Sequence, residues 1–217
     1  MFIGHFAAGI AFKGVDRQVP LWALLVAVQL VDIATMIFVL IGIERLDIVP
    51  GFTKYNDFDM FMPFTHSLVM TPVWAAIGAA LYWLYDRQAS RAALLTIAAA
   101  VACHWFLDLI VHVPDLPILL SEDWKVGFGL WNMPLVTVLI EASMLTLALL
   151  IYRRSRDPRF AINRIILGAI CVIFYLFVIQ PFIMPLPVAN TQEAAITGLA
   201  AFLIVPLMGY FAERRLR

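Results

Sequence analysis

Residues that can bind a metal recur at helical spacing within one apolar stretch of the sequence. They are His104, Asp108, His112 and Asp115. At about 100° per residue, these four positions fall within about 80° of one another and share one face of a helix. The side chains of His104 and Asp108, four residues apart, would start about 5–6 Å from each other, close enough for both to bind one ion. The four positions together span about 16 Å along the helix axis, so one ion could bind only some of them.

Other apolar stretches hold three further residues of the same types. Asp32 lies near the middle of one stretch, His66 near the start of another, and His5 close to the N-terminus. The expected depths place Asp32 and His66 beside the His104–Asp108 pair, in the outer half of a bilayer. Histidine and aspartate ligands without cysteine suit Zn²⁺, Mn²⁺ or Fe²⁺. We therefore predict a divalent-metal site, with zinc favoured, whose ligands are Asp32, His66, His104 and Asp108, with His5 as a further candidate.

The same residues also allow explanations without a metal. An ionisable side chain inside a membrane helix costs about 2.5–3.5 kcal/mol on insertion scales, so each one needs a role. Hydrogen bonds between helices are one such role, and Asp–His chains that conduct protons or ions are another. Clustering in neighbouring stretches favours the metal, but both alternatives stay open. Glu141 stands apart from these residues. It is either a hydrogen-bond partner of a ligand histidine or a polar side chain within the helix packing.

The composition predicts that these residues lie in a membrane protein. Of 217 residues, 63% are hydrophobic and 14% are charged, and the formal net charge is zero. An ordinary soluble domain has about 25% charged residues. So few charges could not cover the surface of a soluble protein, and a nucleic-acid-binding protein needs a basic face. Soluble enzymes and nucleic-acid binders are therefore excluded.

Six apolar stretches reach the length of about 20 residues that a membrane helix needs. They are residues 20–43, 63–85, 92–113, 130–152, 165–184 and 194–211. They predict an all-α, polytopic helix bundle that forms one integral membrane domain over residues 1–217. Residues 1–12 are apolar but too short to cross, so we expect them to lie in the interface or to enter the membrane and return.

The basic residues are distributed unevenly over this six-helix arrangement. Twelve of the 15 Lys and Arg residues lie on the side that holds both termini, and only Arg45, Lys54 and Lys125 lie on the other. The positive-inside rule therefore places both termini in the cytoplasm. The outer loops are acidic, and Glu44 is one of these loop acids. No cleavable signal is visible, so the first long stretch is expected to serve as an uncleaved anchor.

Several short motifs occur in a characteristic order. They are Gly4-His5, Asp32, Phe64-Thr65-His66-Ser67 and His104-Trp105-Phe106-Leu107-Asp108. This order resembles the bacterial inner-membrane family described as membrane-bound metal-dependent hydrolases, whose pattern is Gly-His, Pro-Asp-x-Asp, His-x-Gly-Phe-Thr-His-Ser and Ser-His-x-x-x-Asp. It is more distantly similar to zinc-dependent phospholipase C-like proteins. The resemblance covers roughly residues 2–116 and implies a metal-dependent hydrolase of the bacterial inner membrane.

The chain departs from that pattern at two positions. Ala34 stands where the family has its second aspartate, and Phe61 stands where it has a histidine five residues before the one in Thr-His-Ser. Both departures remove candidate ligands, which puts a two-metal site and the activity in question. The residues that could compensate are Asp57, Asp59, His112 and Asp115.

Together these features predict a membrane-embedded hydrolase that acts on a lipid ester or phosphoester, or on another amphiphilic small molecule. His112 and Asp115 would transfer a proton or bind the polar part of the substrate. A transporter or proton relay that uses the buried His/Asp cluster is the first alternative. A membrane module without catalytic activity is the second, and Ala34 and Phe61 favour it.

Overall fold

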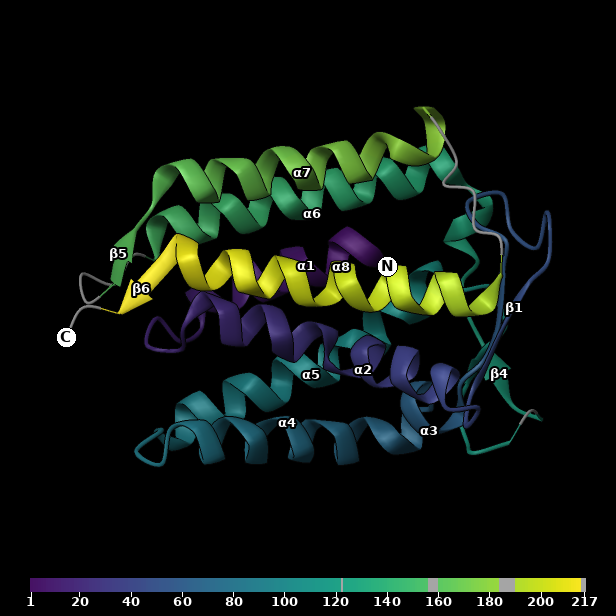
Figure 1. Ribbon diagram of the computed structural model, residues 1–217, viewed down its shortest axis with the longest axis horizontal. Helices are drawn as coiled ribbons and strands as arrows, with labels where there is room; N and C mark the ends of the chain where they lie inside the picture. The colour runs from purple at the N-terminus through teal and green to yellow at the C-terminus, as the bar shows by residue number, and fades with distance from the viewer. Residues whose placement is uncertain (122, 156–159, 184–189, 216–217) are drawn as a thin grey trace.

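The protein is an all-α helix bundle, as the composition predicts. The computed structural model describes residues 1–121, 123–155, 160–183 and 190–215. The long helices lie side by side along the longest axis of the molecule (Figure 1). The helices are α1 (Phe2–Ala11), α2 (Leu21–Leu40), α3 (Pro63–His66), α4 (Thr71–Tyr85), α5 (Arg91–Val111), α6 (Pro134–Arg154), α7 (Arg164–Ile183) and α8 (Thr191–Ala212).

Short antiparallel strand pairs close the two ends of the bundle (Figure 1). At one end, β1 (Arg45–Ile48) pairs with β2 (Phe58–Phe61), and β3 (Leu116–Pro117) pairs with β4 (Lys125–Val126). At the opposite end, β5 (Phe160–Ile162) pairs with β6 (Glu213–Arg215). The segments between α2 and α3 and between α5 and α6 are therefore partly ordered as hairpins. The first of them folds back so that residue 44 lies beside the segment that precedes α3.

Five helical segments of the described residues are long and apolar enough to cross a membrane. They are Leu21–Leu40, Leu68–Tyr85, Arg91–Val111, Pro134–Arg154 and Thr191–Ala212. The apolar segment Arg164–Ile179 of α7 is shorter than these five. The end predicted for that stretch, residue 184, lies outside the described residues. The membrane protein predicted from composition is consistent with these helices.

The second predicted span, residues 63–85, is not one continuous helix. It divides into α3, a 3-10 turn at Leu68–Met70, and α4, with Ser67 in an extended conformation between them. Pro72 at the start of α4 lacks the N–H that would bond to the carbonyl of Leu68, and its ring would clash with that carbonyl in a continuous helix. The interruption leaves His66 at the end of a separate short helix.

The first helix, α1, lies inside the bundle rather than on a membrane surface. It packs against α2, α5 and α6, and Ile3, Phe6 and Ile10 are fully buried. Its ten residues extend about 15 Å, half of a typical hydrocarbon core, so α1 enters the bundle without crossing it. At Gly9 a Cβ atom would lie 3.2 Å from the carbonyl oxygen of Leu24, so a glycine permits the close approach of α1 and α2. Residues 2–11 therefore belong to the interior of the bundle rather than to its surface.

Candidate metal centre

The five predicted ligands come together in the interior of the bundle from four separate helices. His5 comes from α1, Asp32 from α2 and His66 from the end of α3, while His104 and Asp108 lie one turn apart on α5. The three histidines and Asp108 are at most 3% exposed. The Asp32 side chain is 17% exposed. The cluster is thus almost sealed from its surroundings.

Asp32, His66 and His104 form a compact triangle of donor atoms. The Nε2 atoms of the two histidines are 3.2 Å apart, and Asp32 Oδ1 lies 3.4 Å from that of His66 and 3.5 Å from that of His104. Ligands of a tetrahedral ion at about 2.0–2.1 Å are separated from one another by about 3.3–3.4 Å. The triangle therefore has the dimensions of one face of a tetrahedral site. A fourth position remains for another ligand or for substrate.

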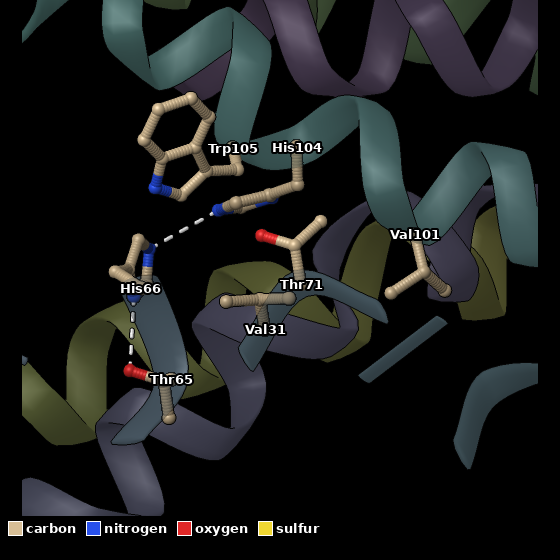
Figure 2. A pocket seen from close by; sticks show the side chains of 7 residues that line it. All are labelled: Val31, Thr65, His66, Thr71, Val101, His104 and Trp105. Atoms are coloured by element: carbon tan, nitrogen blue, oxygen red, sulfur yellow. Dashed lines mark hydrogen bonds between the residues drawn. The ribbon is translucent and has the colours of Figure 1, made fainter. Parts of the chain in front are cut away.

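Hydrogen bonds on the far side of each ring orient the two histidines. His104 Nδ1 lies 2.7 Å from the carbonyl oxygen of Val28. A carbonyl oxygen only accepts, so His104 carries its hydrogen on Nδ1 and keeps the lone pair of Nε2 for the cluster. His66 Nδ1 lies 2.9 Å from Thr65 Oγ1 and 3.1 Å from Thr35 Oγ1. Figure 2 shows the Nε2 atoms of His66 and His104 pointing toward each other.

That contact between two nitrogen atoms is the most informative feature of the cluster. When His66 also carries its hydrogen on Nδ1, two lone pairs face each other at 3.2 Å. Two lone pairs at that distance repel unless a cation lies between them. A metal ion or a proton would supply that charge. Asp32, at 3.4 and 3.5 Å from the two nitrogens, adds a negative group on the side where the cation would lie.

Asp108 and His5 form a second group with His104. Asp108 lies with Oδ2 3.0 Å from His104 Nε2 and with Oδ1 3.2 Å from His5 Nε2, and the His5 ring stacks on the His104 ring at 3.8 Å. Neither ring nitrogen of His5 has a hydrogen-bond partner among the described residues. Because His104 Nε2 has one lone pair, it can bind an ion in only one of the two groups at a time. The cluster therefore fits one ion at His104 rather than two.

The N-terminal turn of α1 is fixed beside the same carboxylate. The amino group of Met1 donates to Asp108 Oδ1 at 2.7 Å. The backbone N–H of Ile3 donates to Glu141 Oε2 at 3.0 Å. Glu141 therefore binds the start of α1, where the free N–H groups of a helix favour a negative charge. Among the described residues, no hydrogen bond connects Glu141 to a candidate ligand histidine.

His112 and Asp115, predicted as proton-transferring residues, lie just beyond the end of α5. The helix ends at Val111, and Pro114 disfavours its continuation. His112 Nδ1 is 2.8 Å from Asp115 Oδ1, and its Nε2 is 3.9 Å from Asp108 Oδ1. His112 can therefore keep a hydrogen on Nδ1 toward Asp115 while its Nε2 faces the cluster. This arrangement allows a histidine to accept and return a proton.

Glu44, Thr65 and Thr35 were not predicted as part of the site. Glu44 is 5% exposed and accepts hydrogen bonds from the backbone N–H groups of Phe64 and Thr65 and from the Thr65 hydroxyl. Burial raises the pKa of the Glu44 carboxyl above its usual value, and these hydrogen bonds oppose the rise. The sequence offered two signals for the threonines. Thr65 directly precedes His66, and Thr35 follows Asp32 by three residues, on a neighbouring face of α2.

A cavity of about 10 Å³ adjoins the two histidines, enough for one water molecule. Its lining comes from α2, α3, α4 and α5 and comprises Val31, Thr65, His66, Thr71, Val101, His104 and Trp105 (Figure 2). The indole N–H of Trp105 has no hydrogen-bond partner among the described residues. A lipid could not enter this space unless the surrounding helices moved apart.

The two departures from the family pattern do not affect the cluster equally. Ala34 lies two residues after Asp32, about 200° further around α2, so an aspartate there would point away from the cluster. Phe61 lies in β2, opposite Arg45. Asp57 accepts a hydrogen bond from the backbone of Gly51 in its own loop. Asp59 lies in β2, opposite Asp47. These contacts place Asp57 and Asp59 in the segment between α2 and α3, while His112 lies beside the cluster.

The comparisons with known proteins found no matching family model, no matching curated protein and no matching solved structure. The resemblance to membrane-bound metal-dependent hydrolases therefore depends on the motifs alone. The geometry of the His/Asp cluster is what the structure adds to them.

Proposed function

We propose that this protein is a membrane-embedded metal-dependent hydrolase whose ion is held by Asp32, His66 and His104. The observation that carries the proposal is the pair of Nε2 atoms that face each other at 3.2 Å beside the Asp32 carboxylate. One aspartate and two histidines with no thiolate favour zinc, with manganese or iron as the other suitable ions. Asp108, 3.0 Å from His104 Nε2, belongs with His5 to the second group, so the fourth position of the ion is left for water or substrate.

A divalent ion bound there would polarise an ester or phosphoester oxygen and make water a better nucleophile near neutral pH. His112 would accept the proton of the attacking water, since Asp115 holds its Nδ1–H and leaves Nε2 free on the side of the cluster. The position of the cluster between membrane-spanning helices favours a substrate that is itself in the bilayer, such as a lipid ester or phosphoester. Such a substrate would have to separate the helices around the small cavity.

The bacterial inner membrane is the location that the motif resemblance implies. Basic residues at the end of the bundle that carries β5 and β6 support cytoplasmic termini (Figure 1). Those within the described residues are Lys13, Arg17, Arg87, Arg91, Arg153, Arg154, Arg164, Arg214 and Arg215. Arg156, Arg159 and Arg217, which the same prediction counted, lie outside the described residues.

Elemental analysis of the detergent-purified protein tests the proposal. We expect about one divalent ion per chain in the wild type, and a loss of most of it in His104→Ala. Cys103→Ala is the matched control, because Cys103 precedes His104 on α5 but bonds only to the Ala100 carbonyl. Phosphatidylethanolamine and phosphatidylglycerol in mixed micelles serve as substrates, followed by released fatty acid and released headgroup. Wild-type protein without an ion, or a His104→Ala variant with unchanged ion content, would contradict the proposal.

A proton or ion relay is the second candidate, and the small size of the cavity favours it. About 10 Å³ admits a water molecule, a proton or an ion without any movement of the helices, whereas a lipid needs them to open. Proteoliposomes with an imposed pH gradient would then show a flux that Asp108→Asn abolishes. Metal content with lipid hydrolysis and no such flux would favour the hydrolase.

A further inference from the structure

The carboxylate of Glu44 is bound to the short helix that carries His66. Oε1 accepts the backbone N–H groups of Phe64 and Thr65, both at 2.9 Å, and Oε2 accepts the Thr65 hydroxyl at 2.7 Å. Glu44 precedes β1, and the β1–β2 pairing returns the chain to α3. A loop residue is thereby placed next to the helix that presents a proposed ligand.

The Thr65 hydroxyl has one hydrogen, and this limits what it can do for His66. When that hydrogen is donated to Glu44, Thr65 Oγ1 can only accept from His66 Nδ1, 2.9 Å away. A bond to a carboxylate is stronger than one to a neutral imidazole, so Glu44 is the preferred acceptor. The Thr35 hydroxyl, the other neighbour of His66 Nδ1, also has acceptors elsewhere for its hydrogen: Thr65 Oγ1 at 2.7 Å and the Val31 carbonyl at 3.0 Å. Both hydroxyls are therefore left to accept from His66 Nδ1.

We propose that Glu44 is a positioning residue that acts through Thr65 to keep the hydrogen of His66 on Nδ1. The lone pair of His66 Nε2 then faces His104 and Asp32, in the orientation that binding an ion requires. Metal-ligating histidines generally donate their other ring N–H to a carboxylate or carbonyl, which fixes the tautomer and makes the ligand more basic. Here a threonine hydroxyl lies between the ring and the carboxylate. The functional consequence of this tautomer rests on the proposed metal site, but the tautomer itself can be measured without a metal.

Glu44→Gln separates this role from the support of α3. Glutamine has the same shape, and its carbonyl oxygen can still accept the two backbone N–H groups. Its amide nitrogen can only donate, so at Thr65 it would reverse the hydrogen bond and turn the Thr65 hydrogen toward His66 Nδ1. We expect His66 to change to the tautomer that is protonated on Nε2, and the affinity for Zn²⁺ to fall by about 10–100-fold.

Thr65→Val and Thr65→Ser provide a second test if Glu44→Gln fails to fold. Valine removes the hydroxyl and should lower the zinc affinity by a similar factor, while serine retains the hydroxyl and should restore it. The matched control is Asp47→Asn, which removes one acidic group from the same outer loop. Asp47 is 48% exposed and pairs with Arg45, away from the cluster. This control should leave both the tautomer and the affinity unchanged.

The experiment combines two measurements on each variant in detergent. Nitrogen-15 NMR of the metal-free protein, with the His66 signals assigned by comparison with a His66→Gln variant, reports the tautomer. Competition with a zinc chelator reports the affinity. An Nδ1-protonated His66 in the wild type that changes in Glu44→Gln supports the inference. The same tautomer in both, or an equal zinc affinity in both, overturns it. A wild type that binds no zinc refutes the proposed hydrolase, while the NMR result still decides the role of Glu44.

Discussion

The bundle buries two polar clusters, and they differ in how their donors and acceptors are matched. One lies near the end with β5 and β6, around Lys13. Its ammonium group bonds to Glu213 Oε2 at 2.9 Å, to the Val19 carbonyl at 2.7 Å and to the Arg17 carbonyl at 3.0 Å. It also lies 4.2 Å from the centre of the Phe160 ring. All three hydrogens of the ammonium group thus have acceptors.

The acidic partner in this first cluster is matched as well. Glu213 accepts the backbone N–H of Leu21 at 2.7 Å and the Tyr152 hydroxyl at 3.2 Å, in addition to Lys13. These bonds join the segment after α1 to the first turn of α2, the end of α6 and the start of β6. The Lys13–Glu213 cluster is therefore closed, with complementary charges and complementary hydrogen bonds.

The His/Asp cluster around His104 has the opposite character. In the tautomers proposed above, the Nε2 atoms of His66 and His104 both accept and face each other at 3.2 Å, and His5 has two buried ring nitrogens without hydrogen-bond partners among the described residues. Both clusters are buried, so burial alone does not distinguish a structural site from a functional one. What distinguishes them is the match of hydrogen-bonding groups: each hydrogen of the Lys13 ammonium has an acceptor in the first cluster, whereas the proposed tautomers bring two acceptors together in the second.

The largest effect that tests this contrast should come from breaking the closed cluster. Glu213→Ala leaves the Lys13 ammonium buried without its carboxylate, and the removal of one partner of a buried ion pair costs about 3–5 kcal/mol. Unfolding in a denaturing detergent should show this loss of stability. The double variant Lys13→Met/Glu213→Leu removes both charges and should lose much less. A Glu213→Ala variant as stable as the wild type would show that the matched charges and hydrogen bonds of the Lys13–Glu213 cluster do not stabilise the fold.

A second prediction concerns proton transfer at the edge of the His104 cluster. Asp115→Asn retains the shape of the side chain but no longer holds the Nδ1–H of His112. We expect lipid hydrolysis to fall by about 10²-fold, the lower end of the range for acid–base groups, equivalent to about 2.7 kcal/mol. The ion content should stay at the wild-type level, because neither residue belongs to the triangle. A parallel loss of the ion would assign Asp115 to the metal site instead.

The sequence predicts the helices and the clustering of the His and Asp side chains well because both depend on local patterns. A run of about 20 apolar residues can only be a helix in a membrane, and an aspartate or histidine within such a run costs enough free energy to require a partner. Asp32, His66, His104 and Asp108 could each be identified for that reason. Their convergence then follows from similar depths in neighbouring helices.

What the sequence does not predict depends on contacts between distant segments. Glu44 has the pattern of an ordinary loop acid, and only the β1–β2 pairing, with Arg45 opposite Phe61, returns it to the start of α3. Lys13 and Glu213 are separated by 200 positions, and no local pattern joins them. The burial of α1 is decided by its packing against α2 and α6, whereas its composition fits an interfacial helix equally well.

A third prediction uses the metal itself to distinguish the two clusters. Zn²⁺ at a free concentration ten times its dissociation constant should stabilise the wild type by about 1.4 kcal/mol, through preferential binding to the folded state. The shift should disappear in His66→Ala, which removes one corner of the triangle. It should persist in Lys13→Met/Glu213→Leu, because the closed cluster offers no ligand set. A zinc-dependent shift that survives in His66→Ala would place the ion elsewhere.

The smallest expected effects compare one uncharged change in each cluster, measured without metal. Tyr152→Phe removes the hydroxyl that bonds to Glu213 at 3.2 Å and should cost about 1 kcal/mol, the typical net contribution of one hydrogen bond. His5→Leu removes two buried ring nitrogens that have no hydrogen-bond partners among the described residues, and at 3.2 Å from Nε2 the Asp108 carboxylate keeps the Met1 amino group as its partner, so the metal-free stability should stay unchanged or increase. The signs of the two changes in the free energy of unfolding decide the comparison. Equilibrium unfolding of both variants in the presence of a metal chelator measures them. If His5→Leu costs more than Tyr152→Phe, the His104 cluster is already satisfied without an ion, and the contrast between the two clusters fails.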